Sequence, residues 1–199
     1  MKKQIIFTTI FSILSLIKIY SQQVVDISTY ENCTDGCNDN KYYKDLNNSY
    51  SKFIGVWQNT TGNMTFKVTV SKKEFVENTL AINSYADEIV LKYMMIKDKG
   101  LSTETIIYRS DKNYLNSNQP WWEVYRSRAT NGNMFGNIIL DNCIPPTANY
   151  PYVMGRLRFE LNTSTNPVTA HWTVRRFSGL RLSDEPDFTI PKDIILNKQ

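Results

Sequence analysis

Apolar and polar residues alternate one by one in two long segments of this chain, and this pattern limits the fold more than any other feature. In the first segment the apolar residues are Met64, Phe66, Val68 and Val70, separated by Thr65, Lys67 and Thr69. In the second they are Val153, Leu157, Phe159 and Leu161, set among Met154, Arg156, Arg158 and Glu160. A period of two puts each set on one face of an extended strand, so both segments are predicted to be strands with one buried face.

Other short segments also have the composition of strands. They are residues 52–58, 88–96, 104–109, 121–127, 134–140, 168–177 and 188–196. Turn-forming clusters of Asn, Gly, Ser and Pro separate them, without an intervening helical period. We therefore predict an all-β fold, an antiparallel up-and-down barrel of about eight or nine strands over residues 51–199, because closure removes exposed sheet edges. Residues 22–50 have no sustained period and are predicted to form an N-terminal extension.

The first 21 residues have the layout of a secretory signal peptide. Met1-Lys2-Lys3 is basic, and a largely apolar run follows it to Ile19. This run is shorter than the ~20 apolar residues of a membrane-spanning helix. We expect cleavage after Ser21, export to the periplasm or the outside of the cell, and a mature chain that does not span the membrane.

Three cysteines, Cys33, Cys37 and Cys143, are the candidates for a disulfide in an exported protein. The spacing does not fix the pairing. A bond from Cys33 or Cys37 to Cys143 would close a long loop and constrain the unfolded chain more than a bond between the two near neighbours. Asp35 and Asp39 lie among the first two cysteines, but the pattern of a zinc or calcium site is incomplete, so we expect no metal.

The charges give little reason to expect a nucleic-acid partner. Of the 23 basic residues, three lie in the predicted signal peptide, which leaves the mature chain with 20 basic and 19 acidic residues. Proteins that bind nucleic acid usually carry a basic domain or stripe.

No group of residues in the sequence predicts an enzyme. His171 is the sole histidine, and it lies in a predicted strand without a Gly-x-Ser-x-Gly nucleophile motif nearby. Nothing in the sequence brings two carboxylates together as glycoside hydrolysis requires. We expect no catalytic residue and no cofactor.

Two features are compatible with binding at the surface. Trp121 and Trp122 are adjacent in a predicted strand, so one indole would face outward, either as a platform for sugar stacking or as packing at the rim. Two arginine pairs have the spacing that places both members on one strand face, Arg126 with Arg128 and Arg156 with Arg158. Each pair would serve either an anionic partner or an ordinary solvated surface.

Gly55 and Trp57 in the segment Phe53-Ile54-Gly55-Val56-Trp57 resemble the Gly-x-Trp signature of the lipocalins. The resemblance implies a lipocalin-like barrel in which the Trp closes one end and an Arg from a late strand lies against its ring. Arg176 is the candidate for that cation and Arg175 the fallback, whereas the second lipocalin motif is absent. The segments KFIGVWQNTTGNMTFKVTVSKKE, DEIVLKYMMIKDKG and FTIPKDIILNKQ resemble a family of small exported bacterial proteins known as a domain of unknown function.

The leading functional hypothesis is a non-catalytic exported protein that binds a small apolar or amphipathic ligand inside the barrel. The residues expected to line such a cavity are Met64, Phe66, Val68, Leu157 and Phe159. In a narrow barrel the same residues would fill a solid core. The alternatives are a surface carbohydrate-binding or adhesion module that uses Trp121 or Trp122 and the arginine faces, and a structural envelope protein.

Overall fold

The protein is a β structure in the computed structural model, which describes residues 22–32, 40–77, 83–110, 126–128, 132–141, 152–177 and 186–199. The strands are β1 (Gln23–Asp26), β2 (Lys41–Lys44), β3 (Gly55–Thr61), β4 (Met64–Glu77), β5 (Tyr85–Lys97), β6 (Thr105–Arg109), β7 (Arg126–Ser127), β8 (Met134–Asp141), β9 (Val153–Asn162), β10 (Thr169–Arg176) and β11 (Asp193–Lys198). A single 3-10 helix, η1 (Ile27–Asn32), follows β1 among the described residues.

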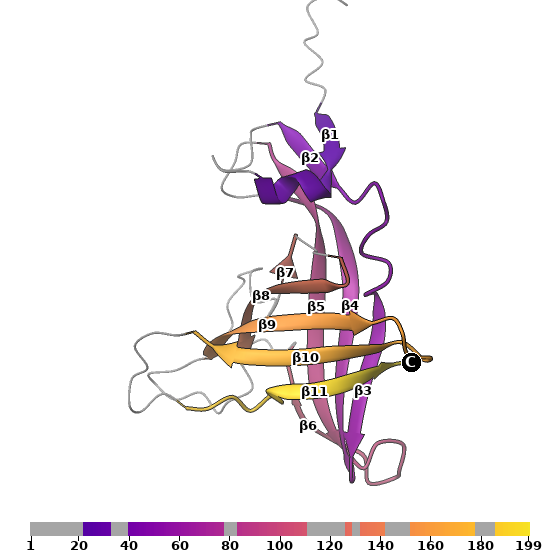
Figure 1. Ribbon diagram of the computed structural model, residues 1–199. Coiled ribbons are helices and arrows are strands. Elements are labelled where there is room, and N and C mark those ends of the chain that lie inside the picture. The colour runs from indigo at the N-terminus through magenta and orange to yellow at the C-terminus, as the bar shows by residue number, and fades with distance from the viewer. Residues whose placement is uncertain are drawn as a thin grey trace, which may run out of the picture.

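All of these strands belong to one sheet that bends into two layers. The order is β1-β2-β5-β4-β3-β11-β10-β9-β8, with β6 and β7 paired to β5. Strands β3 to β5 form one layer and β8 to β11 cross it at a steep angle (Figure 1). The two layers are joined where β11 pairs with β3, at Asn197 with Gln58 and Lys198 with Trp57.

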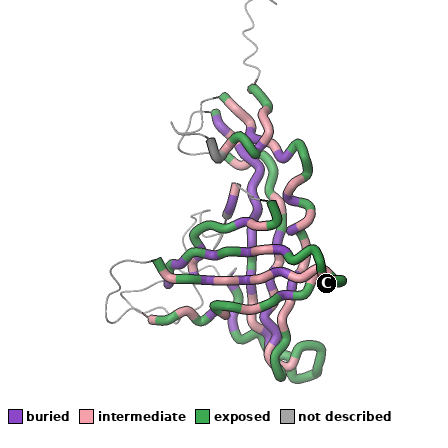
Figure 2. The backbone as a smooth tube through the Cα atoms, in the orientation of Figure 1, coloured by how far each residue is buried: buried purple, intermediate pink, exposed green. Residues whose placement is uncertain are grey.

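The core lies between these layers and is rich in aromatic rings. Trp57, Phe66 and Tyr93 come from the β3 to β5 layer, whereas Phe159 and Trp172 come from β9 and β10. The ring centroids of Trp57 and Phe159 are 5.3 Å apart, as are those of Phe66 and Trp172. Buried and exposed residues alternate along the crossing strands (Figure 2), as one wet face requires.

The predicted all-β, mostly antiparallel fold is confirmed, but the closed barrel is not. Strands β1 and β8 stand at the two ends of the strand order, and no ladder joins them within the described residues. Two pairings are parallel, β1 with β2 and β2 with β5. The sheet therefore encloses its core by folding over at the β11–β3 junction.

The segment before β3 is attached to the main sheet by a buried carboxylate. Asp87, on β5, is fully buried and accepts hydrogen bonds from the Tyr42 hydroxyl at 2.6 Å and from the backbone N–H of Asp45 at 3.0 Å. Burial opposes ionisation of Asp87, but these hydrogen bonds and the nearby Lys72 ammonium together hold its pKa below the usual range. These contacts fix residues 40–50 against the N-terminal end of β5.

Several sequence predictions concern residues outside the described ranges. These are the signal peptide at residues 1–21, the disulfide candidates Cys33, Cys37 and Cys143, and the adjacent indoles of Trp121 and Trp122. In the part of the chain that is described, no helix has the length and apolar character to cross a membrane.

Candidate functional site

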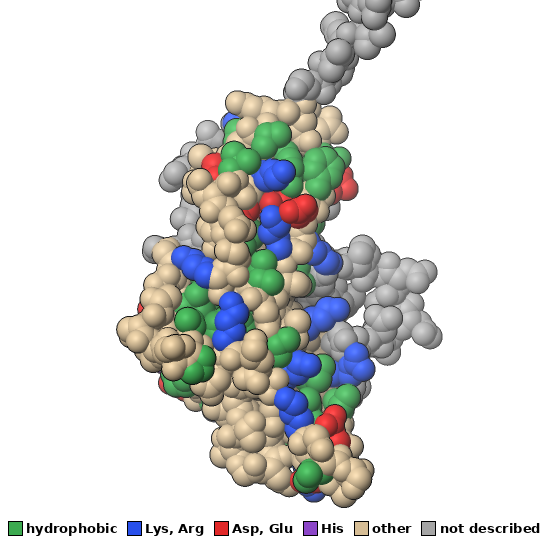
Figure 3. Space-filling view, turned by 90° about the vertical axis from the view of Figure 1, so that its right-hand side faces the viewer, with side chains coloured by type: hydrophobic (Ala, Val, Ile, Leu, Met, Phe, Trp, Pro, Cys, Tyr) green, Lys and Arg blue, Asp and Glu red, His purple; other side chains and the backbone are tan. Residues whose placement is uncertain are grey.

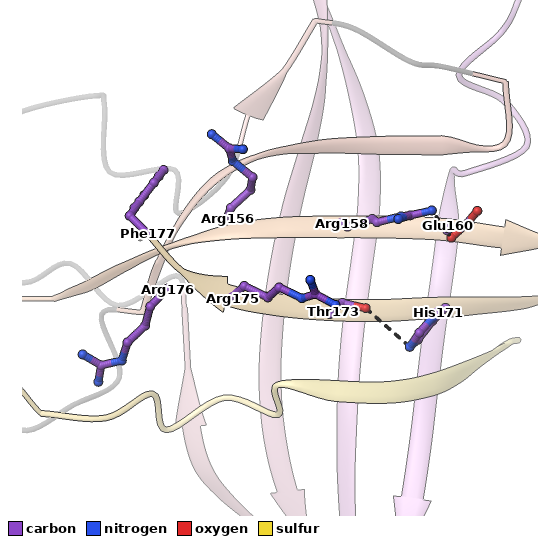
Figure 4. Close-up of a pocket in the computed structure, with 8 residues that line it drawn as sticks. All are labelled: Arg156, Arg158, Glu160, His171, Thr173, Arg175, Arg176 and Phe177. Carbon is purple, nitrogen blue, oxygen red and sulfur yellow. Dashed lines mark hydrogen bonds and ion pairs between the residues drawn. The ribbon is translucent and has the colours of Figure 1, made fainter. Parts of the chain in front are cut away.

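A groove of about 550 Å³ lies on the outer face of β9 and β10. Figure 4 shows the side chains that line it. They are Arg156, Arg158, Glu160, His171, Thr173, Arg175, Arg176 and Phe177, and we call this surface the arginine groove. Four of the eight lining residues are arginines and one is acidic, so the groove is strongly basic.

The strand alternation explains why these side chains face solvent. In β9, Val153, Leu157 and Phe159 are buried, whereas Met154, Arg156 and Arg158 are exposed on the opposite face. Arg175 of β10 is the cross-strand partner of Arg156, and Thr173 is the partner of Arg158. The ladder therefore brings three arginines from two strands to neighbouring positions on one face.

Arg156 and Arg175 are the most unusual pair in the groove, because like charges directly opposite each other destabilise a sheet. Both residues are exposed. Arg156 lies over the Phe177 ring at 5.6 Å. Neither guanidinium forms a hydrogen bond or ion pair with any other described residue. Their charges are therefore available to a ligand.

The other two arginines are already engaged. Arg158 forms an ion pair with Glu160 at 2.7 Å. Arg176 donates to the Pro186 carbonyl and to Asp187, and in Figure 4 its side chain points away from Arg175. Hydrogen bonds from the Lys192 side chain, the Phe188 backbone and Arg176 lower the pKa of Asp187 to about 2. Arg176 thus holds the segment before β11.

His171 borders the groove but lacks the geometry of a catalytic relay. Its Nε2 lies 2.6 Å from Asp193 Oδ1 and 3.4 Å from the Thr173 hydroxyl. A relay needs the acid on one ring nitrogen and the nucleophile on the other, whereas both contacts here fall on Nε2. The described residues also contain no group of three His, Cys, Asp or Glu side chains suited to a metal ion.

Trp57 of the lipocalin-like signature is part of the protein core, but the cation that lies over its ring is not the arginine predicted from the resemblance. Trp57 is fully buried, and its indole N–H donates to the Phe53 carbonyl at 2.8 Å. The cation over its ring is Lys198, with Nζ 5.2 Å from the centroid. Gly55 has a φ of 137°, and a Cβ there would lie 3.2 Å from Lys198 Cε, so a glycine makes room for this lysine.

Arg176 is therefore not the cation that stacks on Trp57. It lies over Phe188, with a distance of 5.4 Å to the ring centroid. Arg176 is the last residue of β10, and its cross-strand partner is Gly155. The opposite, N-terminal end of β10 pairs with the part of β11 that meets β3. The fallback, Arg175, is exposed in the arginine groove. Both candidates are at the wrong end of β10 to reach Trp57.

The residues predicted to line a ligand cavity lie in the core. Phe66, Val68, Leu157 and Phe159 are at most 2% exposed, and Met64 is half-buried at the start of β4. Arg128 of the other predicted arginine pair has a structural position, because it donates to Glu88 at 2.7 Å and to the Tyr30 hydroxyl at 2.6 Å. Arg175 joins Arg156 through the β9–β10 register, and no single-strand pattern reveals that pairing.

Comparison with known proteins gives a family and no activity. No curated protein and no solved structure matches the chain. A family model described as a family of unknown function, DUF6705, matches residues 1–199. Because that match covers the full sequence, the chain belongs to the family of unknown function DUF6705.

Proposed function

We propose that this chain is an exported, non-catalytic protein that binds an anionic ligand in the arginine groove. The observation that carries the proposal is the cross-strand pair Arg156 and Arg175, two exposed guanidinium groups without an ion-pair partner among the described residues. Guanidinium groups bind phosphate, sulfate and carboxylate through pairs of N–H donors, and a shared anion would turn their mutual repulsion into attraction.

Apolar side chains border these arginines. Ile138 is the cross-strand partner of Arg156 and is 46% exposed, and Met154 and Phe177 are exposed by 42% and 40%. A purely ionic ligand would leave these side chains in water. The favoured ligand is an amphipathic anion whose charged group lies between the arginines and whose apolar part covers this border.

The alternative of an apolar ligand inside the sheet has less support. The side chains proposed to line such a cavity contact other rings, including Phe135 with Phe159 at 4.9 Å and Phe66 with Trp172 at 5.3 Å. Rings packed at these distances occupy the space that a ligand would need. Binding on the outer face requires neither an internal cavity nor a closed barrel.

The binding test uses two anionic probes and a matched charge control. The probes are a sulfated dextran oligosaccharide and phosphatidylcholine vesicles that contain phosphatidylglycerol. The variant Arg156→Gln/Arg175→Gln should lose about tenfold or more in affinity for the probe that binds, because each charge-assisted hydrogen bond contributes about 1.5–3 kcal/mol. The control Lys67→Gln/Lys92→Gln removes the same charge from strands β4 and β5 and should bind like the wild type.

Each outcome of this experiment has a definite meaning. Binding of the vesicles, with or without the dextran, supports an amphipathic lipid headgroup ligand. Binding of the dextran alone assigns a soluble or cell-surface polyanion and contradicts the contact with the apolar border. In either case higher salt should weaken the binding, because the groove is exposed. The proposal is wrong if the wild type binds neither probe, or if the lysine control loses as much affinity as the arginine variant.

The export part of the proposal depends on the sequence alone. Residues 1–21 have a basic start, an apolar run and a small residue at position 21. An exported protein meets polysaccharides and lipid headgroups outside the cytoplasm, which is consistent with an anion-binding groove.

A further inference from the structure

Phe75 combines three features that are costly in an ordinary surface residue. Its side chain is 49% exposed. Its backbone has a φ of 56°, in the left-handed region that bulky residues rarely adopt. It also lies at the irregularity between Lys73 and Val76 where the β4–β5 register shifts. Strained conformations of this kind persist where the surrounding structure holds them, and they cluster at functional sites.

The surrounding structure holds Phe75 from two sides. Its backbone N–H donates to Oδ1 of the buried Asp87 at 3.3 Å. Its ring stacks on that of Tyr85, with centroids 4.0 Å apart and planes within 10°. The Tyr42 ring meets it nearly at a right angle, with centroids 5.0 Å apart. Three rings from β2, β4 and β5 thus form one cluster, which we call the Phe75 platform.

The platform lies at the end of the molecule formed by β1, β2 and the adjoining ends of β4 and β5 (Figure 1). At this end Figure 3 shows hydrophobic side chains with basic and acidic ones close to them. Lys72 Nζ lies 2.8 Å from Glu74 Oε1, and the Glu74 side chain is 61% exposed. Lys72 also lies 3.4 Å from Asp87 Oδ2 and is 19% exposed, so the group that borders the rings and faces solvent is the Glu74 carboxylate.

Exposed rings beside a charged side chain favour one chemical class of ligand over others. An acyl chain or an apolar protein patch would cover the rings but would also take the exposed Glu74 carboxylate out of water without a new partner, which is unfavourable. A sugar ring has a face of C–H groups that stacks on an aromatic ring and hydroxyl groups that hydrogen-bond to charged side chains at its edge. A neutral sugar satisfies both parts of the surface.

We propose that the Phe75 platform is a carbohydrate-binding site for neutral sugar units, separate from the arginine groove. The ring of Phe75, supported by Tyr85, stacks on the sugar, and the exposed Glu74 carboxylate, held by Lys72, accepts hydrogen bonds from its hydroxyl groups. The backbone strain at Phe75 is retained because it directs the ring toward solvent at this place.

The test uses the full mature chain and an array of neutral oligosaccharides of hexose, N-acetylhexosamine and pentose units, followed by titration calorimetry with the bound glycan. Phe75→Asn should lose about tenfold or more in affinity, as loss of a central aromatic contact does. Because Asn tolerates the left-handed backbone conformation, the melting temperature of the Phe75→Asn variant should stay within about 5 °C of the wild type. Phe75→Trp keeps an aromatic ring and should retain binding.

Two further variants make the result decisive. Ile107→Asn changes an apolar side chain of similar exposure, 48%, on β6 and should leave glycan affinity unchanged. Tyr85→Leu removes the supporting ring without altering the Phe75 backbone and should weaken binding several-fold. Failure of the wild type to bind any neutral glycan, or wild-type affinity in Phe75→Asn, overturns the proposal. A fall of more than about 10 °C in the melting temperature of Phe75→Asn would also overturn it, since the ring would then be structural.

Discussion

The contact between Trp57 and Lys198 leads to a prediction that a double-mutant cycle tests directly. Trp57 is fully buried, its indole N–H is hydrogen-bonded to the Phe53 carbonyl, and Lys198 lies over its ring. Trp57→Ala would remove a side chain whose truncation typically costs ~3–5 kcal/mol and would leave the carbonyl without its donor. That is a large part of the ~5–15 kcal/mol that stabilises an ordinary domain, so a milder substitution is needed to keep the variants folded.

Trp57→Leu keeps part of the apolar volume and removes the aromatic ring. We expect a loss of about 3 kcal/mol in the free energy of unfolding. Lys198→Met keeps the aliphatic stem but removes the cation and its 3.0 Å hydrogen bond to the Lys52 carbonyl. This change should cost about 1–2 kcal/mol, as the sum of a cation–π contact and one hydrogen bond.

The coupling between the two sites is the informative quantity. The double variant should be less destabilised than the sum of the single variants by about 0.5–1 kcal/mol, because the cation–π contact is lost only once. Arg176→Met combined with Trp57→Leu should instead be additive, because Arg176 lies over Phe188. Urea unfolding followed by circular dichroism measures all the variants. Additivity for Lys198 together with coupling for Arg176 would refute the assigned contact and restore the lipocalin-like pairing.

Three other predictions are shorter. Intact-mass analysis of exported protein should find Gln22 as the first residue, and retention of the first 21 residues would contradict the signal peptide. Non-reducing peptide mapping should find one disulfide, with Cys143 joined to Cys33 or Cys37, and recovery of three free thiols would exclude it. Asp87→Asn should lower the melting temperature markedly at pH 7. Since the pKa of Asp87 is lowered on folding, its stabilisation is lost as the pH falls below the ordinary value of 3.8, so the gap from the wild type should narrow at pH 3, and a constant gap would contradict this linkage.

The local part of the fold was predictable from the sequence because a strand repeats every two residues. Alternation in residues 153–161 places Leu157 and Phe159 in the core, and both are fully buried. In residues 64–70 the same alternation places Phe66 and Val68 in the core, and both are buried. Which face a residue occupies depends only on its neighbours in sequence, and for these strands the prediction was correct.

The long-range part was not predictable from one sequence. Arg176 has the inward parity that the lipocalin signature requires, yet the pairings through β11 place it far from Trp57. Lys198, near the C-terminus, takes the position because β11 pairs with β3 at Trp57. The meeting of Arg156 and Arg175 likewise depends on the β9–β10 register. The short strands β1 and β2 were missed because they lack alternation. Strand β1 pairs with β2, and Tyr42 of β2 is held by its hydrogen bond to Asp87.

The near balance of 20 basic and 19 acidic residues after position 21 conceals a separation of charges in space. Among the residues that the structure describes, four carboxylates are buried, those of Asp45, Asp87, Glu88 and Asp141. They accept hydrogen bonds inside the protein, as Asp141 does from the Thr189 backbone and hydroxyl at 2.6 and 3.0 Å. On the face of the molecule that Figure 3 presents, lysines and arginines face solvent along the body, and acidic side chains lie mainly near its ends. Because the field near a surface is set by the exposed charges within about one Debye length, a chain close to neutral presents locally basic faces. An anion that approaches β9 and β10 therefore meets Arg156 and Arg175 first, and the balance of charges in the sequence does not argue against such a ligand.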